Sequence, residues 1–406
     1  MSGRLLFLCH RIPFPPEKGE KIRAFHMLEH LAKSWEVELG CLVDDRADLD
    51  HVAALRRYCS IVEAHWSGSR RQAAMRALLA LRPGQPLSLG WFHEPGLRSW
   101  TDRRLEEGRH QAVFVYSSAM APYAMTAQAR RSGLHRVLDM VDMDSEKWRV
   151  YAEDARTPMR QVWAREARTL LAFERRAASD FDRTIFVSDA EAQAFRDKAP
   201  ECAGRVDHVD NGVELGRFNP ALPSENPFAG RPPAIVFTGT MDYRPNVEAV
   251  RWFAHEVMPL LLQERRVEFH IVGANPSSAV QELDQLPSVH VTGQVPDIRP
   301  YVAHAAVSVA PLRIARGIQN KVLEAMAMAR PVVASPEAFE GVRAIAGRDL
   351  LIADGAADMA RCVLEVLEGR HPGLGEAARA AVRANHDWDG TLQRLDHVMR
   401  PILVPA

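Results

Sequence analysis

Lys321 and Glu324 lie three residues apart at the start of an expected helix, and their types suit the binding of a charged ligand. The helix would open at Gln319 and Asn320, after a tight turn that Gly317 permits. One helical face then offers a cation and, a turn deeper, a carboxylate. A diphosphate suits the free N–H groups of a helix start and a lysine, and a ribose diol suits a carboxylate acceptor. The spacing predicts a sugar-nucleotide site.

The same two residues could instead form an exposed ion pair on an ordinary helix. Their position decides between these interpretations, because a strand-like run at 305–312 precedes the helix and another at 331–334 follows it. Ligands of open parallel sheets bind at the carboxyl ends of strands, which is where this helix would begin. The position therefore favours a binding site.

The turn after the first expected strand holds Gly19, with helical sequence expected from about Ala24. Gly19 would let backbone N–H groups approach a donor phosphate or sugar. Cations of the same loop would lie nearby: Lys18, Lys21 and Arg23. A rigid loop with solvated charges would explain the same residues, so both interpretations stay open.

A second strand, glycine turn and helix occur at 237–246, where Gly239 makes the turn and Asn246 could cap the helix. Arg244 would then clamp the diphosphate beside Lys321 and neutralise the leaving group as the glycosidic bond breaks. The alternative is an exposed loop arginine. Two strand ends that converge on one cleft favour the functional interpretation.

Acidic side chains at 139–146 lie at and beyond the end of another expected strand. Asp142 could accept a hydrogen bond from the donor sugar or from the attacking hydroxyl. Helix capping by Asp144 or Ser145 is an equally simple explanation of this stretch.

Composition excludes several classes of function. With 51 Lys and Arg against 52 Asp and Glu, the chain has no overall field that would attract nucleic acid. Its five scattered cysteines and sixteen histidines show no metal-ligand spacing, so no metal is expected and a reduced, cytoplasmic chain is the simplest interpretation. No apolar run reaches the ~18 residues of a membrane span, so any membrane contact would be peripheral.

Short apolar runs alternate with amphipathic stretches along the whole chain, which is the rhythm of parallel α/β sheets. Strands are expected near 4–10, 37–43, 112–117, 136–141, 184–188 and 206–210, and again near 234–239, 267–272, 289–292, 306–310, 331–334 and 349–352. We therefore expect two Rossmann-like domains facing a cleft. Their expected bounds are 1–219 for an acceptor-binding domain, 220–233 for a Pro-rich linker, 234–386 for a nucleotide-sugar-binding domain, and 387–406 for a helix that crosses back to the first domain.

Several motifs, taken in order, resemble the retaining GT-B glycosyltransferases of family 4, also called group 1. They are Glu174 and Asp180 with 186–191, Val209–Glu214 with Phe218–Pro220, His270–Gly273, and Val291–Val295. The Pro-rich loop at 13–23 and the stretch at 139–148 look closer still to sugar transferases associated with exosortase and exopolysaccharide gene clusters.

This resemblance implies a metal-independent transfer without a cofactor. It implies that Lys321 and Arg244 bind the diphosphate, that Glu324 binds ribose, and that Gly293 to Val295 lie near the base. Two departures concern the donor-sugar contacts: Arg316 stands where the family often has a glutamate, and Gly19 is followed by Glu20 where the family has paired glycines.

We therefore expect transfer of a hexosyl unit from a nucleoside diphosphate sugar to a glycan or lipid-linked acceptor, in exopolysaccharide or cell-surface polysaccharide synthesis. A nucleotide-sugar 2-epimerase of similar shape and a non-catalytic glycan-assembly subunit remain as alternatives. A dinucleotide oxidoreductase is disfavoured, because the first strand is not followed by G-x-G-x-x-G. The expected location is the cytoplasm, with room for peripheral contact at the inner face of the cell membrane.

Overall fold

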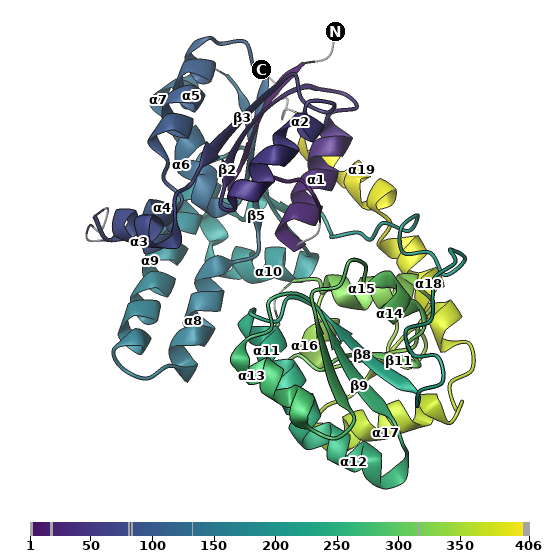
Figure 1. The fold of residues 1–406 in the computed structure, drawn as a ribbon. Coiled ribbons are helices and arrows are strands. Elements are labelled where there is room, and N and C mark those ends of the chain that lie inside the picture. The colour runs from purple at the N-terminus through teal and green to yellow at the C-terminus, as the bar shows by residue number, and fades with distance from the viewer. Residues whose placement is uncertain are drawn as a thin grey trace. The chain divides into compact units, whose positions relative to one another are not determined.

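The computed structural model describes residues 3–16, 19–79, 82, 84–131, 133–315 and 317–400, so Lys18 and Arg316 lie outside the described residues. The chain divides into two compact units, which are described separately. Unit 1 comprises Met1–Asp210 with Leu392–Ala406, and unit 2 comprises Asn211–Thr391. Each is built on a parallel sheet with helices on both faces (Figure 1).

In the described part of unit 1, the sheet has seven parallel strands in the order β3-β2-β1-β4-β5-β6-β7. They are β1 (Arg4–Cys9), β2 (Glu36–Val43), β3 (Ile61–Trp66), β4 (Ala112–Tyr116), β5 (His135–Val141), β6 (Arg183–Phe186) and β7 (Val206–His208). The helices are α1 (Gly19–Leu31), α2 (Val52–Leu55), α3 (Arg70–Leu79), α4 (Leu87–Trp91), α5 (Pro95–Glu106), α6 (Ala121–Ala124), α7 (Ala127–Arg131), α8 (Asp144–Asp154), α9 (Met159–Asp180) and α10 (Asp189–Lys198).

The central strands of unit 1 are the continuous apolar runs of the sequence. β1 and β4 are buried along almost their whole length, because helices cover both faces of a parallel sheet. Phe7 of β1 stacks on Phe114 of β4 with ring centroids 5.0 Å apart. The edge strand β3 was not predicted, since its half-buried sequence mixes Glu63 and His65 with apolar residues.

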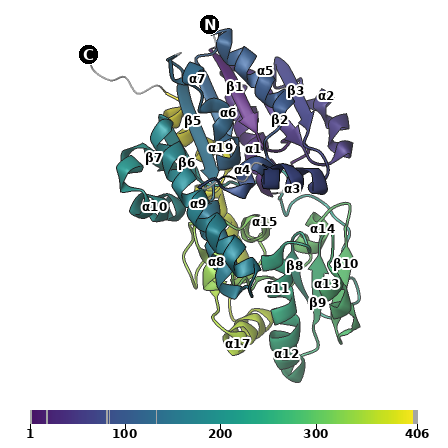
Figure 2. The ribbon, with the colours of Figure 1, turned by 90° about the vertical axis from the view of Figure 1, so that its left-hand side faces the viewer.

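Two expectations about helix starts in unit 1 are wrong. Helix α1 begins at Gly19 rather than near Ala24, so Lys21 and Arg23 are helical residues. Helix α8 begins at Asp144 after Met143 and has no side-chain cap, so neither Asp144 nor Ser145 caps it. Ser145 instead donates from its backbone N–H and its hydroxyl to the buried Glu174 of α9. These bonds join two helices, α8 and α9, that lie side by side (Figure 2).

In the described part of unit 2, the sheet has six parallel strands in the order β10-β9-β8-β11-β12-β13. They are β8 (Ala234–Thr238), β9 (Glu268–Val272), β10 (Val289–Gly293), β11 (Val307–Ala310), β12 (Val332–Ala334) and β13 (Leu351–Ile352). The helices are α11 (Arg244–Trp252), α12 (Met258–Glu264), α13 (Ser278–Gln281), α14 (Arg299–Ala303), α15 (Asn320–Ala327), α16 (Pro336–Phe339), α17 (Ala356–Leu367), α18 (Leu374–Asn385) and α19 (Trp388–Val398), which continues into unit 1.

Alternating side chains of β8 and β9 divide the core of unit 2 into two parts. Ile235 and Phe269 face the main core. Val236 and Val272 face a smaller cluster that Phe228 and Tyr301 of α14 complete. Successive strand residues point to opposite faces, so this alternation assigns every β9 side chain to one layer or the other.

The segment that follows unit 1 packs against the start of α19. Val213 N–H donates to His386 O over 2.8 Å, and a Cβ added to Gly212 would lie 2.7 Å from Cδ2 of Trp388. Trp388 is therefore a packing residue, and only glycine fits opposite it. Within the described residues, no helix is long and apolar enough to cross a membrane.

Candidate functional site

Three neighbouring strands of unit 2 each end at a glycine: Gly239 follows β8, Gly273 follows β9, and Gly293 ends β10. Gly239 and Gly273 approach so closely that a Cβ on Gly273 would lie 1.7 Å from Gly239 O. Gly293 has φ of 68°, a turn conformation that glycine adopts without strain. The ends of β8 and β9 therefore pack main chain against main chain, and the carboxyl edge of these strands is walled by backbone.

Lys321 is held beside this edge by Asn246, which we expected from the sequence to be a helix cap. Its Nζ donates to Asn246 Oδ1 over 2.9 Å, and Asn246 Nδ2 donates to Thr240 O over 2.9 Å. The Nζ also stands 5.0 Å from the ring centroid of Phe237. Asn246 was predicted to cap α11. That prediction is wrong, because Tyr243 is the N-cap and Asn246 lies buried in the first turn.

Lys321 and Glu324 do share the first turns of α15, as predicted, and both are partly exposed. Burial lowers the pKa of Lys321 to about 8, against the attraction of Glu324. Burial raises the pKa of Glu324 to about 7, against the attraction of Lys321 and Arg217. Titratable groups whose charged forms are poised near neutral pH are typical of functional sites.

The start of α15 offers its backbone to a ligand. Gln319 occupies the N-cap without a side-chain cap bond, and its amide instead donates to Gly317 O over 3.1 Å. Gly317 adopts φ of 63°, which explains the glycine at this turn. Asn320 Oδ1 is buried and has no hydrogen-bond partner within the described residues. The start of a helix and an unsatisfied acceptor suit a polar ligand with phosphate and hydroxyl groups.

Arg244 begins α11 two residues before Asn246, so it lies on the same helical turn as the partner of Lys321. Its Nε forms an ion pair with Glu248 Oε1 at 2.6 Å, and its side chain is about one-third exposed. Val295 lies beyond the Gly293 turn and packs half-buried against the Phe228 cluster. Asn246 and Lys321 lie against Gly239, since a Cβ on this glycine would lie 2.7 Å from Asn246 Nδ2 and 3.5 Å from Lys321 Cε, and Arg244 and Val295 belong to the segments that flank them.

In unit 1, Asp142 follows a strained backbone position at the end of β5. Val141 adopts φ of 67°, which is costly for a β-branched residue and is typical of functional sites. Asp139 fixes this turn by accepting from Val141 N–H and from Arg23 Nε, each over 2.9 Å. Asp142 Oδ1 is buried without a hydrogen-bond partner among the described residues. Burial, reinforced by Asp144, raises the pKa of Asp142 to about 6.

The cations expected beside Gly19 are engaged inside unit 1. Arg23 is 1% exposed and also donates to Val209 O over 2.7 Å, while Lys21 pairs with Asp48 at 2.6 Å. These contacts favour the structural interpretation of both residues. Gly19 itself is exposed at the start of α1, so its backbone remains available to a ligand.

Sequence reasoning missed three parts of these sites. Asn246 holds Lys321, Arg217 acts on Glu324, and Ser117 adopts a strained φ of 83° at the end of β4, next to β5. The asparagine three residues into a helix, rather than at its cap, was the available signal for Asn246. The backbone strain at Val141 and Ser117 leaves no recognisable pattern in the amino-acid sequence.

The fold places the protein in the GT-B class of two Rossmann-like α/β domains. Sucrose-phosphate synthase from Thermosynechococcus elongatus superposes with a TM-score of 0.71 at 17% identity, covering 97% of this chain and 98% of the other. Anabaena HepE in complex with UDP and glucose gives 0.68 at 13%, covering 98% and 99%. A glycosyltransferase from Rickettsia africae gives 0.66 at 12%, covering all of both chains.

Residues 232–369 match the family model described as "Glycosyl transferases group 1". The matched segment contains the glycine edge, Asn246, Lys321 and Glu324. No curated protein sequence gives a significant match. The group 1 domain and the GT-B fold together support a glycosyltransferase.

Proposed function

We propose that the protein is a retaining glycosyltransferase that moves a hexosyl unit from a nucleoside diphosphate sugar to a glycan or lipid-linked acceptor. The contact of Lys321 with Asn246 beside the glycine-walled strand ends carries this proposal. This contact fixes a cation at the start of α15. The same helix carries Glu324 one turn further on, where a ribose diol would lie. The family match to this half of the chain supports the assignment.

In this proposal the protein acts by electrostatics and positioning. Lys321, Arg244 and the N–H groups at Gly317, Gln319 and Asn320 hold the diphosphate and stabilise its charge as the glycosidic bond breaks. Glu324 binds ribose, Gly239 lets the phosphates approach the backbone, and the base lies near Gly293 and Val295. No metal and no cofactor takes part in the transfer, because the cationic groups do the work that a metal does elsewhere.

Unit 1 supplies the acceptor side of the proposed reaction. Asp142, with its unsatisfied oxygen, accepts a hydrogen bond from the attacking hydroxyl, and the departing diphosphate takes the proton. Gly19 offers backbone N–H groups to the donor. Arg316 and Glu20 depart from the family pattern at positions expected to contact the donor sugar, so the identity of the sugar has to be determined by experiment.

The proposed setting is exopolysaccharide or cell-surface polysaccharide synthesis at the cytoplasmic face of the membrane. Helix α3 supports peripheral contact with a lipid-linked acceptor, since Met75, Leu78 and Leu79 are 58%, 62% and 80% exposed beside the exposed Arg70 and Arg71. Replacing both leucines by serine should abolish co-sedimentation with vesicles that contain anionic lipid. Equal sedimentation of this variant would refute the contact.

A donor screen tests the function directly. UDP-, GDP-, ADP- and dTDP-sugars are added to the purified protein, and specific binding raises the melting temperature by mass action. HepE, which binds UDP and glucose, suggests starting with UDP-sugars. A responding donor is then incubated with and without acceptor. Glycoside product formed with acceptor supports transfer, conversion of the sugar without acceptor supports a 2-epimerase, and binding without either product supports a non-catalytic subunit.

A further inference from the structure

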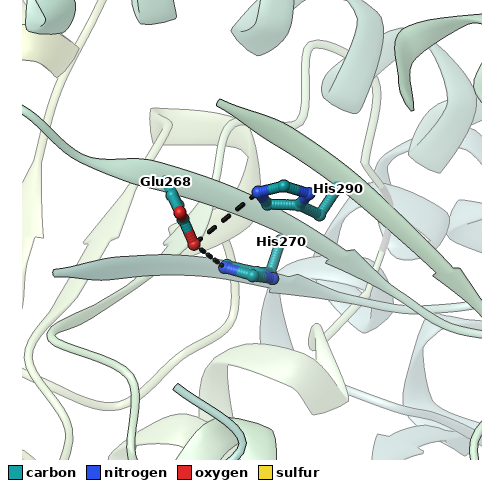
Figure 3. Close-up of side chains that lie close together, drawn as sticks. All are labelled: Glu268, His270 and His290. Carbon is teal, nitrogen blue, oxygen red and sulfur yellow. Dashed lines mark hydrogen bonds and ion pairs between the residues drawn. The ribbon is translucent and has the colours of Figure 1, made fainter. Parts of the chain in front are cut away.

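A cluster of two histidines and a glutamate lies on the sheet of unit 2, away from the strand ends that form the donor site. Glu268 is the first residue of β9, His270 lies two residues on, and His290 is the second residue of the edge strand β10. His290 and His270 are register partners in the parallel ladder. All three side chains therefore project from the same face of the sheet (Figure 3).

The nitrogens of both histidines converge on one carboxylate oxygen. Glu268 Oε2 lies 3.1 Å from His270 Nε2 and 3.6 Å from His290 Nε2. Figure 3 shows both nitrogens directed at this oxygen. One ligand atom from each residue falls within 4.8 Å of the others. Ligands of a tetrahedral zinc ion lie ~3.3–3.5 Å apart, given bonds of about 2.0–2.2 Å. The observed separations fit this geometry with only small side-chain movements.

The packing around the cluster prepares it for a ligand. His290 Nε2 is buried and forms no hydrogen bond within the described residues, although its side chain as a whole is 36% exposed. His270 is almost fully buried, with its ring centroid 4.6 Å from that of Phe228 and the two rings tilted by 50°. A buried nitrogen that has an ion-pair contact but no hydrogen bond calls for an explanation.

We propose that Glu268, His270 and His290 form a zinc site that is separate from the sugar-transfer site. Two imidazoles and one carboxylate make a ligand set that zinc commonly occupies, and the exposed side of His290 leaves a fourth position to water. Binding would tie the edge strand β10 to β9. The cluster lies in the amino-terminal half of β9, whereas the proposed donor site lies beyond its carboxyl end, so zinc bound here would take no part in the proposed sugar transfer.

One further charge faces the cluster. Arg231 Nε lies 3.5 Å from Glu268 Oε2, and the arginine side chain is 45% exposed. As a cation, it competes with a metal ion for the same oxygen. Its exposure lets it turn into solvent when the metal binds. This competition makes a test possible: if Glu268 is a zinc ligand, loss of Arg231 should strengthen zinc binding, whereas an ordinary ion-pair cluster would show no such gain in zinc affinity.

The test is titration of the tag-free, chelator-treated protein with zinc alone, against a chromophoric competitor. We expect one equivalent to bind, and His290→Asn to weaken binding at least about 100-fold, beyond the cost of losing an outer-shell partner. Glu268→Gln provides a second ligand variant. His255→Asn, which alters an exposed histidine of the same unit, should bind as the wild type does. Cobalt should give the visible bands of a tetrahedral site.

Arg231→Gln should tighten zinc binding by about two- to fivefold, the scale of an exposed charge pair. Absence of stoichiometric binding, or wild-type affinity in both His290→Asn and Glu268→Gln, would overturn the proposal. Unchanged or weaker binding in Arg231→Gln would overturn the assignment of Glu268 as a ligand. Sugar transfer is no readout here, so failure of the zinc site and failure of the proposed function remain distinguishable.

Discussion

Replacing Lys321 by methionine should separate the activity of this protein from its stability. Methionine keeps much of the side-chain volume and removes the charge that stands beside Asn246. If Lys321 stabilises the departing diphosphate, turnover should fall by about 10²–10³-fold, the usual effect of losing one electrostatic donor to a transition state. The same change should leave the ligand-free protein at least as stable as the wild type.

The stability effect follows from the pKa of Lys321, which falls from 10.5 to about 8 in the folded protein. Folding therefore disfavours the charged form by roughly 3 kcal/mol, at about 1.4 kcal/mol for each tenfold change in the proton equilibrium. Loss of the hydrogen bond to Asn246 offsets about 1.5–3 kcal/mol of any gain. We expect the free energy of unfolding of Lys321→Met to be between about 0 and 2 kcal/mol higher than that of the wild type near neutral pH.

The sign can be checked with pH. The cost of folding with a charged Lys321 is fully present below about pH 8, the folded pKa, and disappears as the pH rises to 10.5, where the unfolded lysine also loses its proton. The advantage of the variant should shrink over that interval. Denaturant unfolding at several pH values measures it, and Arg251→Met, a change to an exposed cation of α11, serves as the control.

Two results would refute this reasoning. Destabilisation of Lys321→Met by more than about 1 kcal/mol near neutral pH would identify Lys321 as a structural clamp of Asn246. Turnover within tenfold of the wild type, with the donor that the screen identifies, would remove Lys321 from the transfer step.

The remaining predictions concern the strand end of unit 1 and the packing of α19. The pKa of Asp142 is raised to about 6, so its carboxylate forms as the pH rises through that value, and turnover should rise with it. Asp142→Asn should remove this rise from the pH profile and lower turnover about 10²–10⁴-fold. A rise that persists in Asp142→Asn, or that the exposed control Asp50→Asn also removes, would contradict the role of Asp142. Gly212→Ala places a Cβ 2.7 Å from Trp388, so we expect a loss of about 1–3 kcal/mol in denaturant unfolding, and wild-type stability would show that Trp388 can move aside.

Much of the fold could be predicted from sequence, because buried parallel strands carry continuous apolar runs. β1, β4 and β8 fall where expected, and α15 opens at Asn320 with Gln319 before it. The edge strand β3 was missed because an edge strand is partly exposed to solvent, and its sequence therefore mixes polar with apolar residues.

The candidate site was only partly predictable, because its precision comes from contacts between distant segments. Lys321 and Glu324 follow from helical spacing, whereas the hydrogen bond from Lys321 to Asn246 joins residues 75 apart. His270 and His290 come together through strand register, with 20 residues between their numbers and no motif spacing to reveal them. Local periodicity records neither kind of contact.

The glycine edge formed by Gly239, Gly273 and Gly293 has a consequence for how such a protein can be altered. In the proposed donor site, main-chain amide groups keep their place when side chains around them change, so their share of phosphate binding does not depend on those side chains, whereas the shares of Lys321 and Arg244 do. Under the same proposal, the choice of base depends on separate residues, such as Val295 beyond the last glycine. We therefore expect donor preference to change by substitution at such positions while the three glycines and Lys321 are kept.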